Sequence, residues 1–241
     1  MSHTDDIQFL IIPKIKRFSG PLFFTRSLEK AGGNIVNNGS FGLIDTGEKK
    51  LLVTCSHVLA GFRTELAEDG AMKLCACLDR KNPVVLSLEN LIDEDKGADL
   101  ATFDMEPMLS VCEGRSFFRI YCEHIFPVKK GDRLVFVGYP GRHRTETDHG
   151  IVFGTTPHVM IAQDVNHGLV ARTTDMMTMD RHLVAEQHEN PYGGTSGSPC
   201  FVMKNYTSVE LVGFVAGDLK MQQLMHFASA RHLNSDGTIK K

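Results

Sequence analysis

The stretch that decides the fold is PYGGTSGSPC, residues 191 to 200. It places Ser196 among glycines on a turn that Pro199 closes. A turn of this kind holds the serine hydroxyl outward and leaves neighbouring backbone N–H groups free. Attack on a carbonyl needs both features, an exposed Oγ and a pair of N–H groups for the developing oxyanion. An ordinary Gly/Ser/Pro turn between two strands has the same composition, so the rest of the chain has to decide.

A nucleophilic serine needs a base and a group that orients the base. The chain has 11 histidines, so context must select among them. His57 follows the strand-like run LLVTC and precedes a short helical stretch, which lets its ring face a cleft from a rigid base. Asp99 opens the apolar run LATF, where a buried acid needs a donor such as an imidazole N–H. These positions predict the order His57, Asp99 and Ser196 along the chain.

Other interpretations of the base and the acid stay open at this point. His57 could be a core histidine with satisfied hydrogen bonds. Three other acids compete with Asp99. Asp93 and Asp95 lie in a charged stretch that we expect to be a solvated loop, and Asp104 follows the apolar run instead of opening it.

Three blocks together resemble the motifs of the chymotrypsin/trypsin-like serine peptidase family. The block TCSHV (residues 54–58) is similar to the family's Thr-Ala-Ala-His motif, and DLA (residues 99–101) is similar to Asp-Ile-Ala. The block GTSGSP (residues 194–199) is similar to Gly-Asp-Ser-Gly-Gly-Pro. A fourth block, KGDRLVFVGYPG (residues 130–141), resembles the HtrA-type members. The resemblance spans roughly residues 34 to 232.

This resemblance implies an all-β fold of two six-stranded antiparallel Greek-key barrels, with the active site in the cleft between them. The frequent short apolar runs between turn residues agree with it. We expect residues 1–33 to be an N-terminal extension and a possible docking segment, and residues 34–241 to be the peptidase domain. Its first barrel would cover about 34–105, a connection 106–127, and the second barrel 128–241. Asn37-Asn38-Gly39 predicts a turn within residues 34–44.

The resemblance also implies a role for each site residue. His57 would be the general base, Asp99 would orient it, and the N–H groups of Gly194 and Ser196 would form the oxyanion hole. A peptide substrate would pair with the strand after the serine strand and place one side chain in a pocket. The implied substrate contacts are Asn190, Val215, Ala216, Gly217 and Asp218. Basic specificity would need a charge from Glu189 or Asp218, so the substrate preference stays open.

Composition excludes several other classes of function. The chain carries 26 basic and 29 acidic residues, for a net charge of −3, so no nucleic-acid-binding surface is indicated. No apolar run approaches the ~20 residues that would span a bilayer, so no membrane association is expected. The first residues lack the basic and apolar regions of a secretory signal.

The six cysteines do not follow the disulfide framework of the family's extracellular members. Those members often have a cysteine after the catalytic histidine, where this chain has Val58, and another shortly before the serine, where it has residues 190–193. This favours a reducing, cytoplasmic location. Cys75 and Cys77 are spaced too closely for a usual zinc motif, so we expect no metal and no cofactor.

The sequence therefore predicts an intracellular serine endopeptidase that cleaves protein substrates through an acyl-enzyme. Thr195 stands where secreted relatives have an acid that pairs with a freed N-terminus, so control by a regulatory protein partner is favoured over that cleavage. Two alternatives remain: an inactive peptidase-like binding module, and an acyl hydrolase or esterase that uses the same three residues.

Overall fold

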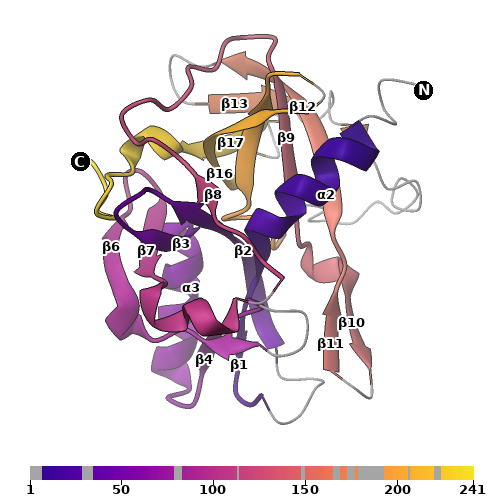
Figure 1. Cartoon of the computed structure of the whole chain (residues 1–241). Coiled ribbons are helices and arrows are strands. Elements are labelled where there is room, and N and C mark those ends of the chain that lie inside the picture. The colour runs from indigo at the N-terminus through magenta and orange to yellow at the C-terminus, as the bar shows by residue number, and fades with distance from the viewer. Residues whose placement is uncertain are drawn as a thin grey trace.

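The structure is a computed structural model that describes residues 7–28, 35–78, 83–112, 114–147, 150–164, 169–172, 177–178, 193–205, 207–219 and 224–241. Two curled, mostly antiparallel sheets make up most of it, and the chain passes from the first to the second after β8 (Figure 1). Among the described residues, no helix has the length and apolar character needed to cross a membrane.

The first sheet has eight strands in the order β5-β4-β1-β2-β3-β7-β6, and β8 pairs with β2 in parallel. The strands are β1 (Ser19–Thr25), β2 (Ile35–Asp45), β3 (Lys50–Thr54), β4 (Lys73–Ala76), β5 (Val84–Val85), β6 (Leu91–Asp95), β7 (Leu100–Asp104) and β8 (Phe118–Arg119).

This first sheet is curled but open, which corrects the expectation of two closed six-stranded barrels. Within the described residues, β6 pairs only with β7, and β5 pairs only with β4. Strand β5 has just two residues, too short to continue the sheet round to the other edge. The fold is therefore one closed barrel and one curled half-barrel.

The second sheet closes into the barrel. Its order is β13-β17-β16-β15-β9-β12-β14, and β13 also pairs with β12, so six strands form a ring. The strands are β9 (Arg133–Gly138), β12 (Thr156–Asp164), β13 (Leu169–Arg172), β14 (Met177–Thr178), β15 (Pro199–Met203), β16 (Val209–Leu219) and β17 (Leu224–Ser229). A separate hairpin joins β10 (Arg144–Thr147) to β11 (Gly150–Phe153).

Alternation along β9 shows how this barrel is packed. Leu134 and Phe136 lie in the barrel's own apolar cluster, whereas Val135 and Val137 belong to the cluster shared with the first sheet. Successive strand residues point to opposite faces, so one strand serves both cores. The two sheets consequently share a continuous apolar interface.

The chain's main helix is α3 (Ser56–Glu68), which directly follows β3 (Figure 1). Its inner face buries Val58, Leu59 and Phe62, in agreement with the helical turn predicted from residue 56. The other helical pieces are a π-helical turn (Ile7–Ile11), α2 (Ile12–Ile15) and 3₁₀ turns at Lys16–Phe18, Leu88–Asn90, Glu106–Val111, Gly141–His143 and Ala230–His232.

The N-terminal segment belongs to the fold itself. The apolar run from Ile7, within the segment expected to be a possible docking element, is helical, with Pro13 in the first turn of α2. Ile7, Ile11 and Ile15 recur every four residues and bury one face in the shared core. Strand β1 then pairs with β2 and β4, so the first sheet begins before the expected boundary at residue 34.

We expect Ile15→Ala to lower the free energy of unfolding by about 2–5 kcal/mol, because it opens a cavity in a packed core. The Ile15 side chain is 1% exposed. Leu10→Ala is the matched control in the same segment, since Leu10 is 50% exposed and should cost at most about 0.5 kcal/mol. Urea unfolding followed by circular dichroism measures both, and equal effects would contradict the burial described here.

Two other local expectations are corrected. Residues 37–39, predicted to turn, run straight through β2. The charged stretch around Asp93, predicted to be a loop, forms β6, where each acid has a donor: Ile239 N–H for Asp93, Arg63 and Ser56 for Glu94, and Ala98 N–H for Asp95. These partners remove the cost of placing carboxylates on a strand.

The C-terminal tail crosses back to the first sheet (Figure 1). Thr102 Oγ1 donates to Gly237 O at 2.7 Å, and Ile239 N donates to Asp93 Oδ2 at 2.8 Å. The N-terminal helix packs against β9 of the second sheet, and the tail after β17 packs against β6 and β7 of the first. Both ends of the chain therefore connect the two sheets and fix the junction between them.

Candidate active site

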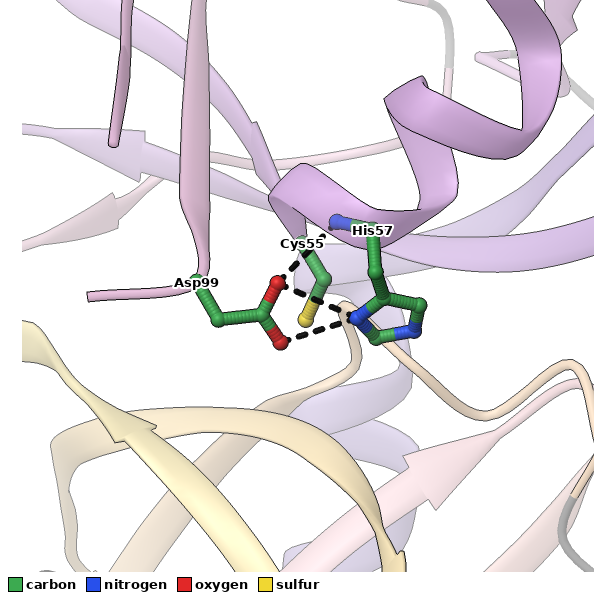
Figure 2. Close-up of side chains that lie close together, drawn as sticks. All are labelled: Cys55, His57 and Asp99. Carbon is green, nitrogen blue, oxygen red and sulfur yellow. Dashed lines mark hydrogen bonds and ion pairs between the residues drawn. The ribbon is translucent and has the colours of Figure 1, made fainter. Parts of the chain in front are cut away.

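His57 is the second residue of α3, immediately after β3 ends. The first N–H groups of a helix have no partner within the helix, so they can bind a carboxylate. His57 N donates to Asp99 Oδ1 at 3.0 Å, and the ring Nδ1 lies 2.8 Å from Asp99 Oδ2. Figure 2 shows the ring and the carboxylate side by side at the start of the helix. The backbone and the ring of one residue thus hold the same carboxylate.

Asp99 lies in the tight turn between β6 and β7, with a φ of 51°. Among the described residues it is the one non-glycine residue with positive φ, a strained conformation that aspartate tolerates better than most. This backbone directs the carboxylate back to His57. The competing acids are engaged elsewhere, Asp104 with Lys49 at 2.5 Å, Asp93 with Ile239 and Asp95 with Ala98.

Ser196 is in a four-residue turn, closed by Ser198 N donating to Thr195 O at 3.0 Å. Gly197, the third residue, has a φ of 92°, as a type II turn requires. Gly197 N then donates to Val215 O at 2.7 Å, and Val215 N donates to Ser198 O at 2.9 Å. The turn is therefore joined to β16 directly before β15 begins.

The same turn is also bonded to the first sheet through β2. Ser40 N donates to Ser196 O at 2.7 Å, and Ser40 Oγ donates to Gly194 O at 2.7 Å. Thr195 is 1% exposed, and its side chain covers Gly138 of β9, where a Cβ would collide with it. Strands β2 and β9 thus hold the backbone around Ser196, without an acid at position 195.

Gly39 of β2 lies between the side chain of Val58 and the backbone of the Ser196 turn. A Cβ placed on Gly39 would lie 2.9 Å from Val58 Cγ1 and 3.3 Å from Ser196 O. Val58 is the residue after His57. This close approach is why β2 needs glycine at a position that the sequence suggested was a turn.

Cys55 is the site residue that sequence reasoning missed. Its thiol is 0% exposed and donates to Val215 O at 3.1 Å, the same carbonyl that Gly197 N binds. Burial raises the pKa of the Cys55 thiol well above its usual range, and the charge of Asp99 raises it further, so the thiol stays protonated at neutral pH. Its place two residues before His57, at the end of a strand, was the available signal.

The expected substrate-pairing residues lie on β16. Pairing between β15 and β16 ends at Pro199 and Phe214, while β17 continues to pair on the other side as far as Leu219. Along residues 216–219, the side of β16 next to the Ser196 turn has no neighbouring strand among the described residues. Only the backbone of Asp218 is described, and Asn190 and Glu189 lie outside the described residues.

Comparison with known proteins agrees with this architecture. The thermostable serine protease AL20 from an extremophilic microorganism is similar in structure, with a TM-score of 0.51 and 12% identity over 88% of this chain and 91% of that protein. Deg5 is similar with a TM-score of 0.50 and 12% identity, over 94% of this chain and 91% of that protein. No protein-family model matches the sequence, and no curated protein sequence is similar to it. The chain therefore has the trypsin-like double-barrel fold and is structurally similar to serine proteases that share it.

Proposed function

We propose that this protein is a serine endopeptidase in which Ser196 attacks the substrate carbonyl and His57 is the general base. The observation that carries the proposal is the 2.8 Å contact between His57 Nδ1 and Asp99, beside the turn that holds Ser196. The sequence order of the three residues and the fold of the chain both support it.

The proposed chemistry follows from which ring nitrogen is engaged. With its Nδ1–H donated to Asp99, neutral His57 has its lone pair on Nε2, which can accept the Ser196 hydroxyl proton. Serine Oγ then bonds to the carbonyl carbon, and the imidazolium passes the proton to the leaving amine. Water repeats the sequence on the acyl-enzyme. Asp99 remains ionised and stabilises the imidazolium.

The proposed oxyanion hole consists of the N–H groups of Gly194 and Ser196. Gly194 has a φ of 94°, and a Cβ on it would collide with the Asn38 amide and lie 2.8 Å from Tyr139 O. The Asn38 Nδ2 group donates to that same carbonyl at 2.9 Å. These contacts, from Asn38 of β2 and from Tyr139 directly after β9, support a fixed orientation of the Gly194 peptide.

We expect Gly194→Ala to lower kcat by about 10²- to 10³-fold, because crowding shifts one of the two oxyanion donors. Gly131→Ala is the matched control: its φ is 93°, and a Cβ there meets nothing within 4 Å. It carries the same backbone strain, about 1 kcal/mol, away from the site. Steady-state kinetics together with melting temperatures separate the two effects. If both variants lost activity equally, the assignment of Gly194 would be wrong.

The unpaired edge of β16 supports a protein substrate rather than a small ester. An extended peptide could add there as a strand, with main-chain hydrogen bonds from residues 216–218 providing affinity, since the N–H and C=O of Val215 are already bonded to the Ser196 turn. That edge adjoins the turn of Ser196, so a bound peptide would pass its carbonyl over the serine. We propose no side-chain preference.

The test has two steps. A fluorophosphonate probe should label the wild-type protein and fail to label Ser196→Ala; an unlabelled wild type would favour the inactive binding module. Denatured casein and a simple ester then separate the other two functions. Casein cleavage supports the endopeptidase, whereas hydrolysis of the ester alone supports the acyl hydrolase.

We also propose a reducing, cytoplasmic location. All six cysteines lie within the described residues, and none of them forms a disulfide. Burial raises the pKa of Cys75 to about 11, which keeps this thiol protonated and unreactive. Control by a protein partner stays a prediction, and residues 7–25, part of the segment expected to dock that partner, are packed within the domain itself.

A further inference from the structure

Cys55, His57 and Asp99 form a compact set of potential metal ligands. Their thiol, imidazole and carboxylate atoms all lie within 4.8 Å of one another. Figure 2 shows the Cys55 sulfur beside the Asp99 carboxylate, on the side that faces the His57 ring. In the described part of the chain, this is the one group of three such residues.

The donor set matches the ligands that zinc prefers. Zinc binds thiolate at about 2.3 Å and imidazole or carboxylate at about 2.0–2.2 Å, usually in a tetrahedron. Ligand atoms of such a site are separated by roughly 3.3–3.7 Å by that geometry. His57 Nδ1 and Asp99 Oδ2, 2.8 Å apart, would separate slightly, and Cys55 Sγ would approach them by rotation of its side chain.

The charges of the site also suit a dication. A Cys55 thiolate alone would be strongly disfavoured in a 0% exposed position beside an ionised aspartate. With Zn²⁺, one thiolate, one carboxylate and one neutral imidazole sum to zero. The side chains of His57 and Asp99 are 48% and 24% exposed, so an ion can reach the site from the His57 side.

We propose that Zn²⁺ binds between Cys55, His57 and Asp99 and reversibly inactivates the enzyme. Binding releases the thiol proton of Cys55 to solvent. The single ring proton of neutral His57 moves, by exchange with solvent, from Nδ1 to Nε2, and the metal takes the Nδ1 lone pair. Nε2 then has no lone pair to accept a proton from Ser196. The inhibitory effect rests on the proposed peptidase function, whereas the binding itself does not.

The binding experiment uses full-length Ser196→Ala protein, so it is independent of catalysis. Titration with Zn²⁺ in competition with a chromophoric chelator measures affinity, and Co²⁺ as a spectroscopic substitute should show a thiolate-to-metal charge-transfer band. Cys55→Ser and, separately, His57→Ala should each weaken Zn²⁺ binding by at least about 100-fold. Loss of a residue that only hydrogen-bonds to a metal ligand already lowers metal affinity by about 10- to 100-fold, and loss of a ligand itself should cost more. Cys55→Ser nearly preserves the side-chain volume in a buried position, and His57→Ala removes a side chain that is 48% exposed. We therefore expect both variants to fold.

Cys112→Ser is the matched control, a partly buried thiol that donates to Met108 O away from the site. It should leave both affinity and the Co²⁺ spectrum unchanged. A band that survives Cys55→Ser, or that disappears in Cys112→Ser, would overturn the proposal. So would the absence of any binding by Ser196→Ala.

The inhibition experiment uses the wild-type protein and the fluorophosphonate probe. Zn²⁺ should block labelling, and EDTA should restore it. Equal protection of Cys55→Ser by Zn²⁺ would refute this zinc site as the cause. If the Co²⁺ band forms as expected but the metal-free wild type is never labelled, the peptidase function fails while the metal site stands.

Discussion

Replacing Ser196 with alanine is expected to lower kcat by about 10⁶-fold, the largest effect of any single substitution in this chain. The change removes the oxygen that would form the acyl-enzyme. Ser196 O accepts from Ser40 N at 2.7 Å, so the backbone of the turn keeps its main anchor. The loss is measured as the rate of casein cleavage by Ser196→Ala compared with the rates of the wild-type protein and of casein without enzyme.

Ser198→Ala is the control, because it removes a hydroxyl from the same turn. Ser198 is 0% exposed, and its Oγ has no hydrogen-bond partner, so its loss breaks no bond. This variant should keep most of the wild-type activity and its melting temperature. Loss of activity in Ser198→Ala together with retention in Ser196→Ala would show that the nucleophile has been misassigned.

Asp99→Asn is expected to lower kcat by about 10⁴-fold with little change in folding. An asparagine can present its amide N–H to Nδ1, which stabilises the ring tautomer that lacks a lone pair on Nε2. Asparagine also tolerates the φ of 51° at this position, so backbone strain does not confuse the result, as it would with Asp99→Ala. The pH dependence of kcat and the low-field proton resonance of the His57 ring report the change independently of protein stability.

Asp104→Asn provides the matched control at the other end of β7. Desolvation is the largest single effect on Asp104 and raises its pKa, but the hydrogen bonds from Lys49 and from the Glu106 N–H, together with the charge of Lys49, outweigh it. The pKa of Asp104 is therefore held below its usual value, and this carboxylate is ionised. It contacts Lys49 rather than His57. The variant should leave kcat and the His57 resonance unchanged. A comparable fall in kcat would mean that the effect of Asp99→Asn is electrostatic and non-specific.

Local sequence was a good guide where one strand or helix decides the conformation. The apolar run before His57 became β3, the residues after Cys55 became α3, and the run from Leu100 became β7. The choice of Asp99 over Asp93 and Asp95 agrees with the contacts of these acids, since the opening of an apolar run marks the turn end of a strand.

The sequence-based predictions were wrong where one type of residue occurs in two different structural settings. Asn37-Asn38-Gly39 has the composition of a hairpin turn, yet Gly39 is glycine because Val58 and Ser196 O leave no room for a Cβ. The acids of β6 suggested a solvated loop, yet donors from α3 and from the C-terminal tail satisfy them. Both contacts join residues far apart in the chain, so no local pattern could reveal them.

By itself, the sequence determined the order of the candidate residues and their placement at the ends of strands, because those depend on local turns and on apolar periodicity. The double-barrel class came from the resemblance of its motif blocks to those of the trypsin-like family. Only the tertiary structure decided that the first sheet stays open, that residues 7–25 belong to the domain, and that β2 and β9 hold the Ser196 turn. It also decided that Cys55 lies beside Asp99, since a buried thiol acquires its partners only when two sheets meet.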